Sequence, residues 1–172
     1  WNESSIHSFA FQSPLVVTPN AKRYVWNSTS GLSSLQSDPI TVSTSGSVIG
    51  NYKTQYYLNV TTNPAEVLTL NPMAVNGSGW YDSGSTAVVN AVQNVDKVLG
   101  SSRYDFRSWT GATPDPTKPG PNPATVLMDA PKTATANYVL QYRLTLAANP
   151  SITTPSGQGW YDTGTYASIS TA

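Results

Sequence analysis

The chain of 172 residues contains one histidine, His7, and no cysteine, so few side chains are suited to nucleophilic or acid–base catalysis. A serine triad needs its serine on a sharp strand-to-helix turn, and His7 lies in a strand-like segment without such a motif. The nine acidic residues are spread singly, without the paired carboxylates typical of glycoside hydrolysis. We therefore expect no catalytic residues, and the sequence predicts that the protein is not an enzyme.

Oxygen ligands for a calcium ion are equally scarce. Asp115 and Asn122 offer them, but both lie in the proline-rich stretch "GATPDPTKPGPNP" (111–123), which has no EF-hand pattern. So much proline is incompatible with a helix or a central strand, and it favours an extended surface loop. The sequence thus predicts a solvated loop, with no metal site and no cofactor.

A lysine–asparagine isopeptide bond would need a lysine, an asparagine and an acid together in an apolar core. Lys132, Asn137 and Asp129 are the right residue types, but they lie in one local segment. Because lysine is rarely buried, we expect Lys132 to be solvated rather than cross-linked.

Acceptor motifs for asparagine-linked glycans occur at Asn2, Asn27, Asn59 and Asn76. A chain so rich in asparagine, serine and threonine contains such motifs by chance, so position matters more than number. Asn59 is expected to point away from the face that Leu58 and Val60 share, and Asn76 lies beside a turn. Both are therefore expected to be accessible to a glycan.

Aromatic rings are the other residues with clear binding chemistry, because exposed rings stack on sugars. Four of them are related in pairs by an internal repeat, Trp26 with Phe106 and Trp80 with Trp160, and this equivalence favours packing in repeated cores. Trp109 has a threonine, Thr29, at its related position. It is therefore the candidate for an exposed, sugar-binding aromatic.

The repeat itself has four matching segments. "RYVWNSTSG" (23–31) returns as "RYDFRSWTG" (103–111), and "ITVSTSGSVIGNY" (40–52) returns as "ATVLMDAPKTATANY" (124–138). "YYLNVTTNP" (56–64) returns as "YRLTLAANP" (142–150), and "GSGWYDSGSTAVVNA" (77–91) returns as "GQGWYDTGTYASISTA" (157–172). Matching positions lie 80 to 86 residues apart, which is the length of a small domain.

The repeat is out of phase with the chain. It predicts half a module at 1–52, a complete module at 53–139 and half a module at 140–172, with equivalent strands at about 1–12 and 161–172. The C-terminal half of one copy could complete the N-terminal half of the next and so propagate a filament. The residues expected in this inter-subunit strand are Ile6, Phe9, Phe11, Tyr166 and Ile169. The alternative is that the 172 residues are part of a longer repeat array, which would explain the two half modules without any assembly.

Apolar and polar residues alternate with a period of two, as at Leu58 and Val60 or at Ala87 and Val89, which is typical of half-buried antiparallel strands. Glycine, proline and asparagine punctuate these runs. The predicted fold class is all-β, with tandem small antiparallel modules that are β-grasp-like or immunoglobulin-like sandwiches and no significant helix. In the stretch 85–100 the start is predicted as strand and the tail as loop.

These segments resemble the divergent InlB-type B-repeat group of bacterial and archaeal surface proteins, above all its archaeal versions. The resemblance covers about 21–172 and is carried by "YKTQYYLNVTTNP", "GSGWYDSGSTA", "RYDFRSWTG" and "PATVLMDAPKTATANY". It implies an all-β module strung in tandem in large exported proteins, with stalk, surface-layer, adhesion or filament roles and no catalysis. The stretch "AEVLTLNPMAV" (65–75) and the first twenty residues depart from the pattern.

Composition narrows the function further. Charged residues make up 10% of the chain and the formal net charge is zero, which removes the clustered lysine and arginine that nucleic acids and anionic membranes require. No apolar run is long enough to span a membrane. We expect an extracellular or cell-surface structural glycoprotein, whose partners are neighbouring copies, adjacent repeats or surface glycans. The alternative is a carbohydrate-binding accessory module of a secreted enzyme or adhesin.

Overall fold

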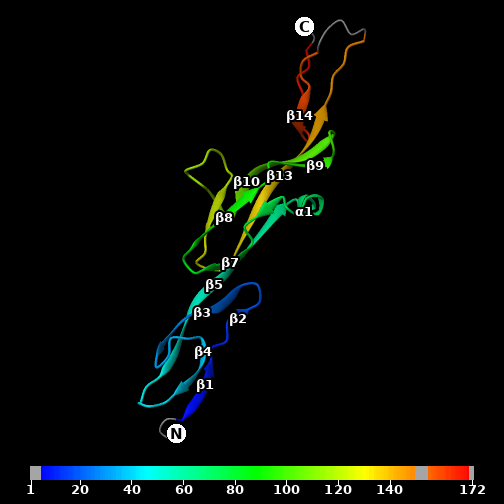
Figure 1. Ribbon diagram of the computed structural model, residues 1–172. Helices are drawn as coiled ribbons and strands as arrows, with labels where there is room; N and C mark the ends of the chain where they lie inside the picture. Colours follow the sequence, from blue (N-terminus) through cyan, green and yellow to red (C-terminus); the bar gives the residue numbers. More distant parts are fainter. Residues whose placement is uncertain (1–4, 150–154, 171–172) are drawn as a thin grey trace. The chain divides into compact units, whose positions relative to one another are not determined.

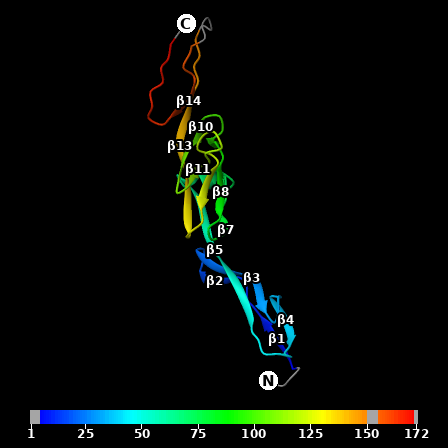
Figure 2. The ribbon, with the colours of Figure 1, turned by 90° about the vertical axis from the view of Figure 1, so that its left-hand side faces the viewer.

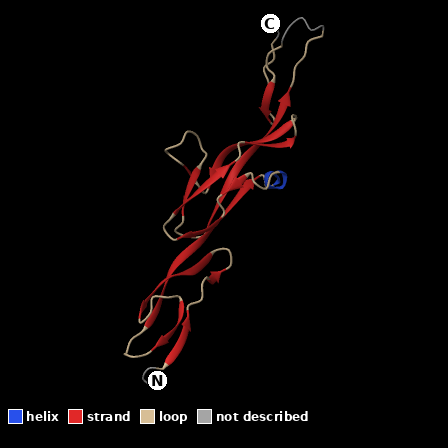
Figure 3. Ribbon diagram, in the orientation of Figure 1, coloured by secondary structure: helices blue, strands red, loops and turns tan. Residues whose placement is uncertain are grey.

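The computed structural model describes residues 5–149 and 155–170, and strands dominate this part of the chain (Figures 1 and 3). The helix α1 spans only Glu66–Leu70. The strands are β1 (Ile6–Ala10), β2 (Leu15–Thr18), β3 (Lys22–Gly31), β4 (Ser37–Thr41), β5 (Val48–Asn63), β6 (Val75–Asn76), β7 (Gly79–Asp82), β8 (Thr86–Ala91), β9 (Asn94–Val98), β10 (Ser102–Thr110), β11 (Thr113–Pro114), β12 (Ala124–Leu127), β13 (Lys132–Leu144) and β14 (Gly159–Asp162). The predicted all-β class is confirmed.

The chain forms two compact units. The first comprises Trp1–Leu58, Gly79–Thr86 and Leu127–Lys132, and the second comprises Asn59–Ser78, Ala87–Val126 and Thr133–Ala172. These borders differ from the module boundaries expected from the repeat, because the long strand β5 serves both units. Its residues up to Leu58 belong to the first unit, and residues 59–63 belong to the second.

In the first unit, β5 is the centre of an antiparallel sheet. β3 pairs with one edge of β5, from Lys22 opposite Tyr56 to Gly31 opposite Val48, and β2 extends the sheet beyond β3. β7 pairs with residues 55–58 on the other edge of β5. β1 and β4 form a separate two-stranded ladder and lie side by side in Figure 2.

In the second unit, two sheets share one core. β10 lies between β9 and β13, and β14 pairs with the end of β13, while a second sheet has the order β11-β12-β8-β6. Phe106 and Ala136 of the first sheet and Val89 and Val126 of the second are all buried. The Tyr138 hydroxyl joins the sheets, because it donates to a carbonyl oxygen directly after β8 at 2.8 Å. This arrangement is a small β-sandwich.

The repeat is visible in the irregularities of the backbone. β3 and β10 each carry a β-bulge at the same repeat position, directly after Trp26 and directly after Phe106. The glycines that follow, Gly31 and Gly111, have φ angles of +93° and +78°. A Cβ atom there would lie 1.9 and 2.3 Å from a backbone oxygen of the neighbouring chain segment, so only glycine fits.

One local prediction is wrong. The stretch 85–100 begins as β8, as predicted, but its tail is the strand β9 rather than a loop, and β9 pairs with β10. Only Val95 of β9 is buried, so its alternation was too weak to indicate a strand. The stretch 65–75, which has no repeat counterpart of equal length, contains α1. The proline-rich segment 111–123 is largely exposed irregular structure, as predicted.

Candidate functional site

The most regular arrangement of side chains lies where each "GWYD" strand joins its sheet. In the first unit, Arg23 on β3 stands opposite Gln55 on β5, which stands opposite Asp82 on β7. The second unit repeats this row across β10, β13 and β14 with Arg103, Gln141 and Asp162. Since opposite residues of antiparallel strands share a face, each row crosses three strands on one side of the sheet.

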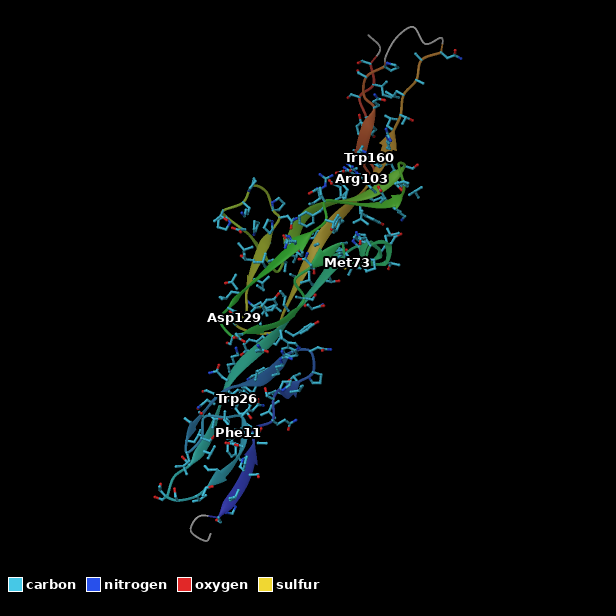
Figure 4. All side chains as sticks on the ribbon, viewed as in Figure 1. Phe11, Trp26, Met73, Arg103, Asp129 and Trp160 are labelled. Atoms are coloured by element: carbon cyan, nitrogen blue, oxygen red, sulfur yellow. The ribbon has the colours of Figure 1, made fainter. Side chains whose placement is uncertain are left out.

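A tryptophan two residues before each aspartate lies on the same face of its strand, and we call the four residues a clasp. Arg23, Gln55, Trp80 and Asp82 form the first clasp, and Arg103, Gln141, Trp160 and Asp162 form the second. In the first clasp, Arg23 Nε donates to Gln55 Oε1 at 2.8 Å, and Gln55 Nε2 donates to Asp82 Oδ1 at 2.6 Å. The Arg23 guanidinium carbon lies 4.5 Å from the centroid of the Trp80 ring. The corresponding distances in the second clasp are 2.9, 2.8 and 4.3 Å, and Figure 4 shows Arg103 next to Trp160.

Each clasp carboxylate also pairs with a cation. Lys53 Nζ on β5 lies 2.7 Å from Asp82 Oδ2, and its hydrogen bond, followed by that of Gln55, lowers the pKa of the Asp82 carboxyl. Asp162 pairs with Arg107 on β10, which also lies 3.2 Å from Asp105. Both carboxylates are thus engaged by cations and amides of their own unit.

The energy of each clasp contact is modest. Exposed ion pairs contribute ~0.2–1 kcal/mol, and an exposed guanidinium over an aromatic ring contributes ~0.5–1 kcal/mol. The larger effect is on register. A slip of β7 or β14 by one residue would turn its aspartate and tryptophan to the opposite face and break the whole row.

The aromatics predicted as core residues divide into two groups. Phe106 is buried, whereas Trp26, Trp80 and Trp160 are half-buried, so only Phe106 is a full core residue. The rings of Trp80 and Trp160 face arginine instead of an apolar core. Trp26 donates from Nε1 to Thr29 Oγ1 at 3.0 Å.

The prediction that Trp109 is an exposed aromatic is wrong. Its exposed fraction is 9%, and its ring centroid lies 5.7 Å from that of Phe106. The repeat contains the explanation, because Phe106 and Trp109 occupy the positions of Trp26 and Thr29, which also contact each other across the bulge. In the second unit a ring–ring contact replaces the hydrogen bond.

The structure places three of the four glycan acceptor motifs, because Asn2 lies outside the described residues. Asn27, Asn59 and Asn76 are all exposed. Asn76 accepts a hydrogen bond from the Asn90 amide at 3.3 Å, and Thr29 of the Asn27 motif is buried. Accessibility therefore does not separate the three sites, although Asn59 stands on the open face of a long strand.

The candidate metal ligands of the proline-rich segment do not converge. The Asp115 carboxylate accepts bonds from the backbone and hydroxyl of Thr117, at 2.9 and 2.7 Å. The Asn122 amide instead bridges the backbone N–H and carbonyl of Ala91, at 3.0 and 2.8 Å. Within residues 5–149 and 155–170, no group of three or more histidine and acidic side chains is placed to hold a metal ion.

The residues considered for an isopeptide bond are also engaged separately. Lys132 Nζ forms an ion pair with Asp129 at 2.7 Å and remains one-third exposed. The Asn137 amide donates to Thr110 Oγ1 at 2.9 Å. This geometry agrees with the expectation that Lys132 is solvated rather than cross-linked.

The residues expected in an inter-subunit strand are mostly accessible. Ile6 on β1 is 70% exposed, and Phe9 and Phe11 are half-buried against each other, with ring centroids 5.6 Å apart. Tyr166 is fully exposed and Ile169 is 57% exposed. His7, also on β1, lies 2.7 Å from the Ser5 hydroxyl through Nε2.

A third polar cluster had no signal in the repeat. Tyr104 on β10 donates its hydroxyl to Glu66 Oε2 at 2.5 Å, and Lys97 on β9 forms an ion pair with the same oxygen at 3.1 Å. These contacts attach α1 to the sheet, and the Tyr104 bond, followed by Lys97, lowers the pKa of Glu66. Desolvation by burial raises the pKa of Tyr104. The repeat did not indicate this cluster, because the counterpart of 65–75 is shorter.

No protein-family model, curated protein or solved structure matches this chain. The resemblance to the InlB-type B-repeat group therefore stays a prediction. Among the described residues, no helix is long and apolar enough to cross a membrane.

Proposed function

We propose that this chain is a structural protein of the cell surface or extracellular space, a tandem β-repeat subunit of a stalk or filament without a catalytic role. The clasp is the observation that carries the proposal. The same four residue types recur at equivalent positions in both units, with similar distances. Their polar atoms bond one another instead of facing a substrate, which supports a mechanical rather than a chemical role.

The geometry of the clasp suits a load-bearing joint. The row from arginine through glutamine to aspartate crosses three antiparallel strands. A force along β7 or β14 loads three neighbouring side-chain contacts together, namely the glutamine–aspartate hydrogen bond, the ion pair of the aspartate and the arginine–tryptophan contact. Each contact is weak alone, but their simultaneous rupture resists sliding of the strands.

Surface chemistry supports an extracellular setting. Asn27, Asn59 and Asn76 are accessible to glycans, which would lie outside the sheets. The formal net charge of zero allows neighbouring copies to pack without net repulsion. We propose neighbouring copies or adjacent repeats as partners, with surface glycans as attachments, and head-to-tail strand complementation as the mode of assembly.

Carbohydrate binding by an accessory module is less well supported. That function would need an exposed aromatic strip including Trp109, which is buried. In addition, guanidinium groups cover a face of Trp80 and of Trp160.

Two measurements test the proposal. Antibody labelling of intact source cells should detect the chain without lysis. In single-molecule stretching of the full chain, Trp80→Leu and Trp160→Leu should lower the unfolding force, whereas Tyr166→Leu, which replaces a fully exposed aromatic ring by leucine, should not. Labelling only after lysis, or equal forces for all variants, would contradict the proposal.

A further inference from the structure

The first unit contains an apolar cavity of about 440 Å³ between β1, β4 and the start of β5. Its walls include Phe9, Leu32, Ile40, Val42 and Val48. An apolar space of this size in a unit with few buried side chains indicates a core that is not filled by the unit itself.

In the second unit, the repeat counterparts of these cavity-lining residues lie in a filled core. By the repeat, Phe9, Ile40, Val42 and Val48 correspond to the following four residues: Val89, Ala124, Val126 and Ala134. All four are buried, with exposed fractions from 0% to 3%. One hydrogen bond beside these residues is also the same in both units. The Tyr138 hydroxyl donates to the carbonyl of Val92, and its counterpart Tyr52 donates to the carbonyl of Gln12 at 2.9 Å.

A strand closes this core in the second unit. Residues 59–63 of β5 belong to that unit, and Val60 and Thr62 are buried there, with exposed fractions of 7% and 5%. Among the described residues of the first unit, no strand stands at this position. Within it, residues 48–53 of β5 pair with β3 on one edge, while β7 on the other edge reaches only residues 55–58. The edge beside the cavity is therefore free within the described residues of this unit.

The chain carries a second copy of the closing strand. "YRLTLAANP" (142–150) is the counterpart of "YYLNVTTNP" (56–64), so Leu146 stands at the position of Val60 and Ala148 at that of Thr62. Residues 145–148 follow β13 without belonging to a strand. Leu144, Leu146 and Ala148 are half-buried and alternate with exposed residues. Residues 145–148 thus have the alternation of a strand with one apolar face, and no strand among the described residues pairs with them.

We propose that residues 144–149 of a second copy of this chain add as a strand to the free edge of β5 at residues 48–53. Leu146 and Ala148 then enter the cavity of the first unit, as Val60 and Thr62 enter the core of the second. This inference rests on the proposed structural function and names the surfaces through which the copies meet. Strand addition of this kind supplies main-chain hydrogen bonds from the edge and specificity from the cavity.

Complementation between two defective chains tests the proposal. Leu146→Asp places a charge on the inserted face, and Val42→Asp places one in the cavity. Thr145→Asp is the matched control, because Thr145 and its counterpart Asn59 are both exposed. Molar mass is measured by light scattering over a concentration series. The molar mass of the parent chain and of the Thr145→Asp variant should rise with concentration. The molar mass of each defective chain alone should stay at the monomer value of 18.4 kDa.

The mixture is the decisive sample. One intact cavity and one intact strand remain between the two defective chains, so their equimolar mixture should stop at a dimer, twice 18.4 kDa. A fluorescent peptide of residues 142–149 provides a second measurement that requires no variant to fold. It should bind the parent chain, and a peptide with Leu146→Asp should bind at least tenfold more weakly.

A parent chain that stays monomeric at all concentrations and does not bind the peptide would overturn the inference. Growth of Leu146→Asp chains equal to that of the parent would also overturn it. Neither outcome affects surface labelling or the force measurements on the clasp, so the proposed function and its mode of assembly fail separately.

Discussion

The two clasps use the same row of residues but neutralise its carboxylate differently. Lys53 on β5 forms the ion pair with Asp82, whereas Arg107 on β10 forms the ion pair with Asp162. Their repeat counterparts are uncharged residues, Val139 and Asn27. The arginine, glutamine, tryptophan and aspartate are therefore the constant part of the joint, and the cation is replaceable. The comparison teaches that register and ring contact define the clasp, and that charge pairing only supplements it.

The two units also differ in how they bury equivalent positions. Phe106 is 3% exposed, while its counterpart Trp26 is half-buried. Phe106→Ala should therefore destabilise the protein by about 3–5 kcal/mol, as expected for a fully buried aromatic. Trp26→Ala should cost clearly less, because part of its ring is already in water. Urea unfolding of both variants checks this difference, and equal losses would mean that the two cores are equally closed.

Glycine positions provide the next comparison. Gly111 and Gly84 have similar φ angles, +78° and +82°, but a Cβ atom at Gly111 would lie 2.3 Å from a backbone oxygen, whereas at Gly84 nothing lies within 4 Å. Gly84→Ala should cost only the conformational term of ~1–2 kcal/mol. Gly111→Ala should cost more, since the backbone must also move. Thermal unfolding of the two variants distinguishes these contributions, and an equal cost would exclude the steric one.

Replacing the glutamine at the centre of each clasp should destabilise the second clasp more than the first. Gln141 is 7% exposed and Gln55 is half-buried. Replacing Gln141 by leucine removes a buried amide that Arg103 and Asp162 share, which should cost ~1–3 kcal/mol, although the Asp162 side chain is one-third exposed and keeps its pair with Arg107. Gln55→Leu should cost less, because water can reach the groups left behind. Denaturant unfolding measures both, and a larger loss at Gln55 would contradict the burial argument.

The smallest effect concerns pH. The pKa of Asp82 is lowered in the folded protein, first by Lys53, so the unfolded chain takes up its proton at higher pH. The stability from this pair is complete above the ordinary carboxyl pKa of 3.8 and is lost as the pH falls through the folded pKa. Because both side chains are about two-fifths exposed, the effect is only ~0.2–1 kcal/mol. Asp82→Asn should flatten the stability profile below pH 4 by this amount, with Asp38→Asn as the control outside the clasp.

The sequence predicted the class of the fold and the pairs of equivalent positions, because both depend on local alternation and on matching segments. It predicted Trp80 and Trp160 as related residues but not the arginine over each ring, since that contact needs the register of three strands. Trp109 was misjudged because its partner Phe106 lies across a bulge that no local pattern reveals. The cluster of Glu66, Tyr104 and Lys97 depends on α1, which lies in the stretch 65–75, where the repeat counterpart is shorter.

Amide hydrogen exchange of the full chain at low and high protein concentration tests the central claim most directly. Strand addition from a second copy predicts that the amides of residues 48–53 that point away from β3, and those of residues 145–149, exchange fast when the protein is dilute and become protected together as the concentration rises. The Leu146→Asp chain should show no such change in either segment. Fast exchange in both segments at all concentrations, or protection of one segment without the other, would contradict the account.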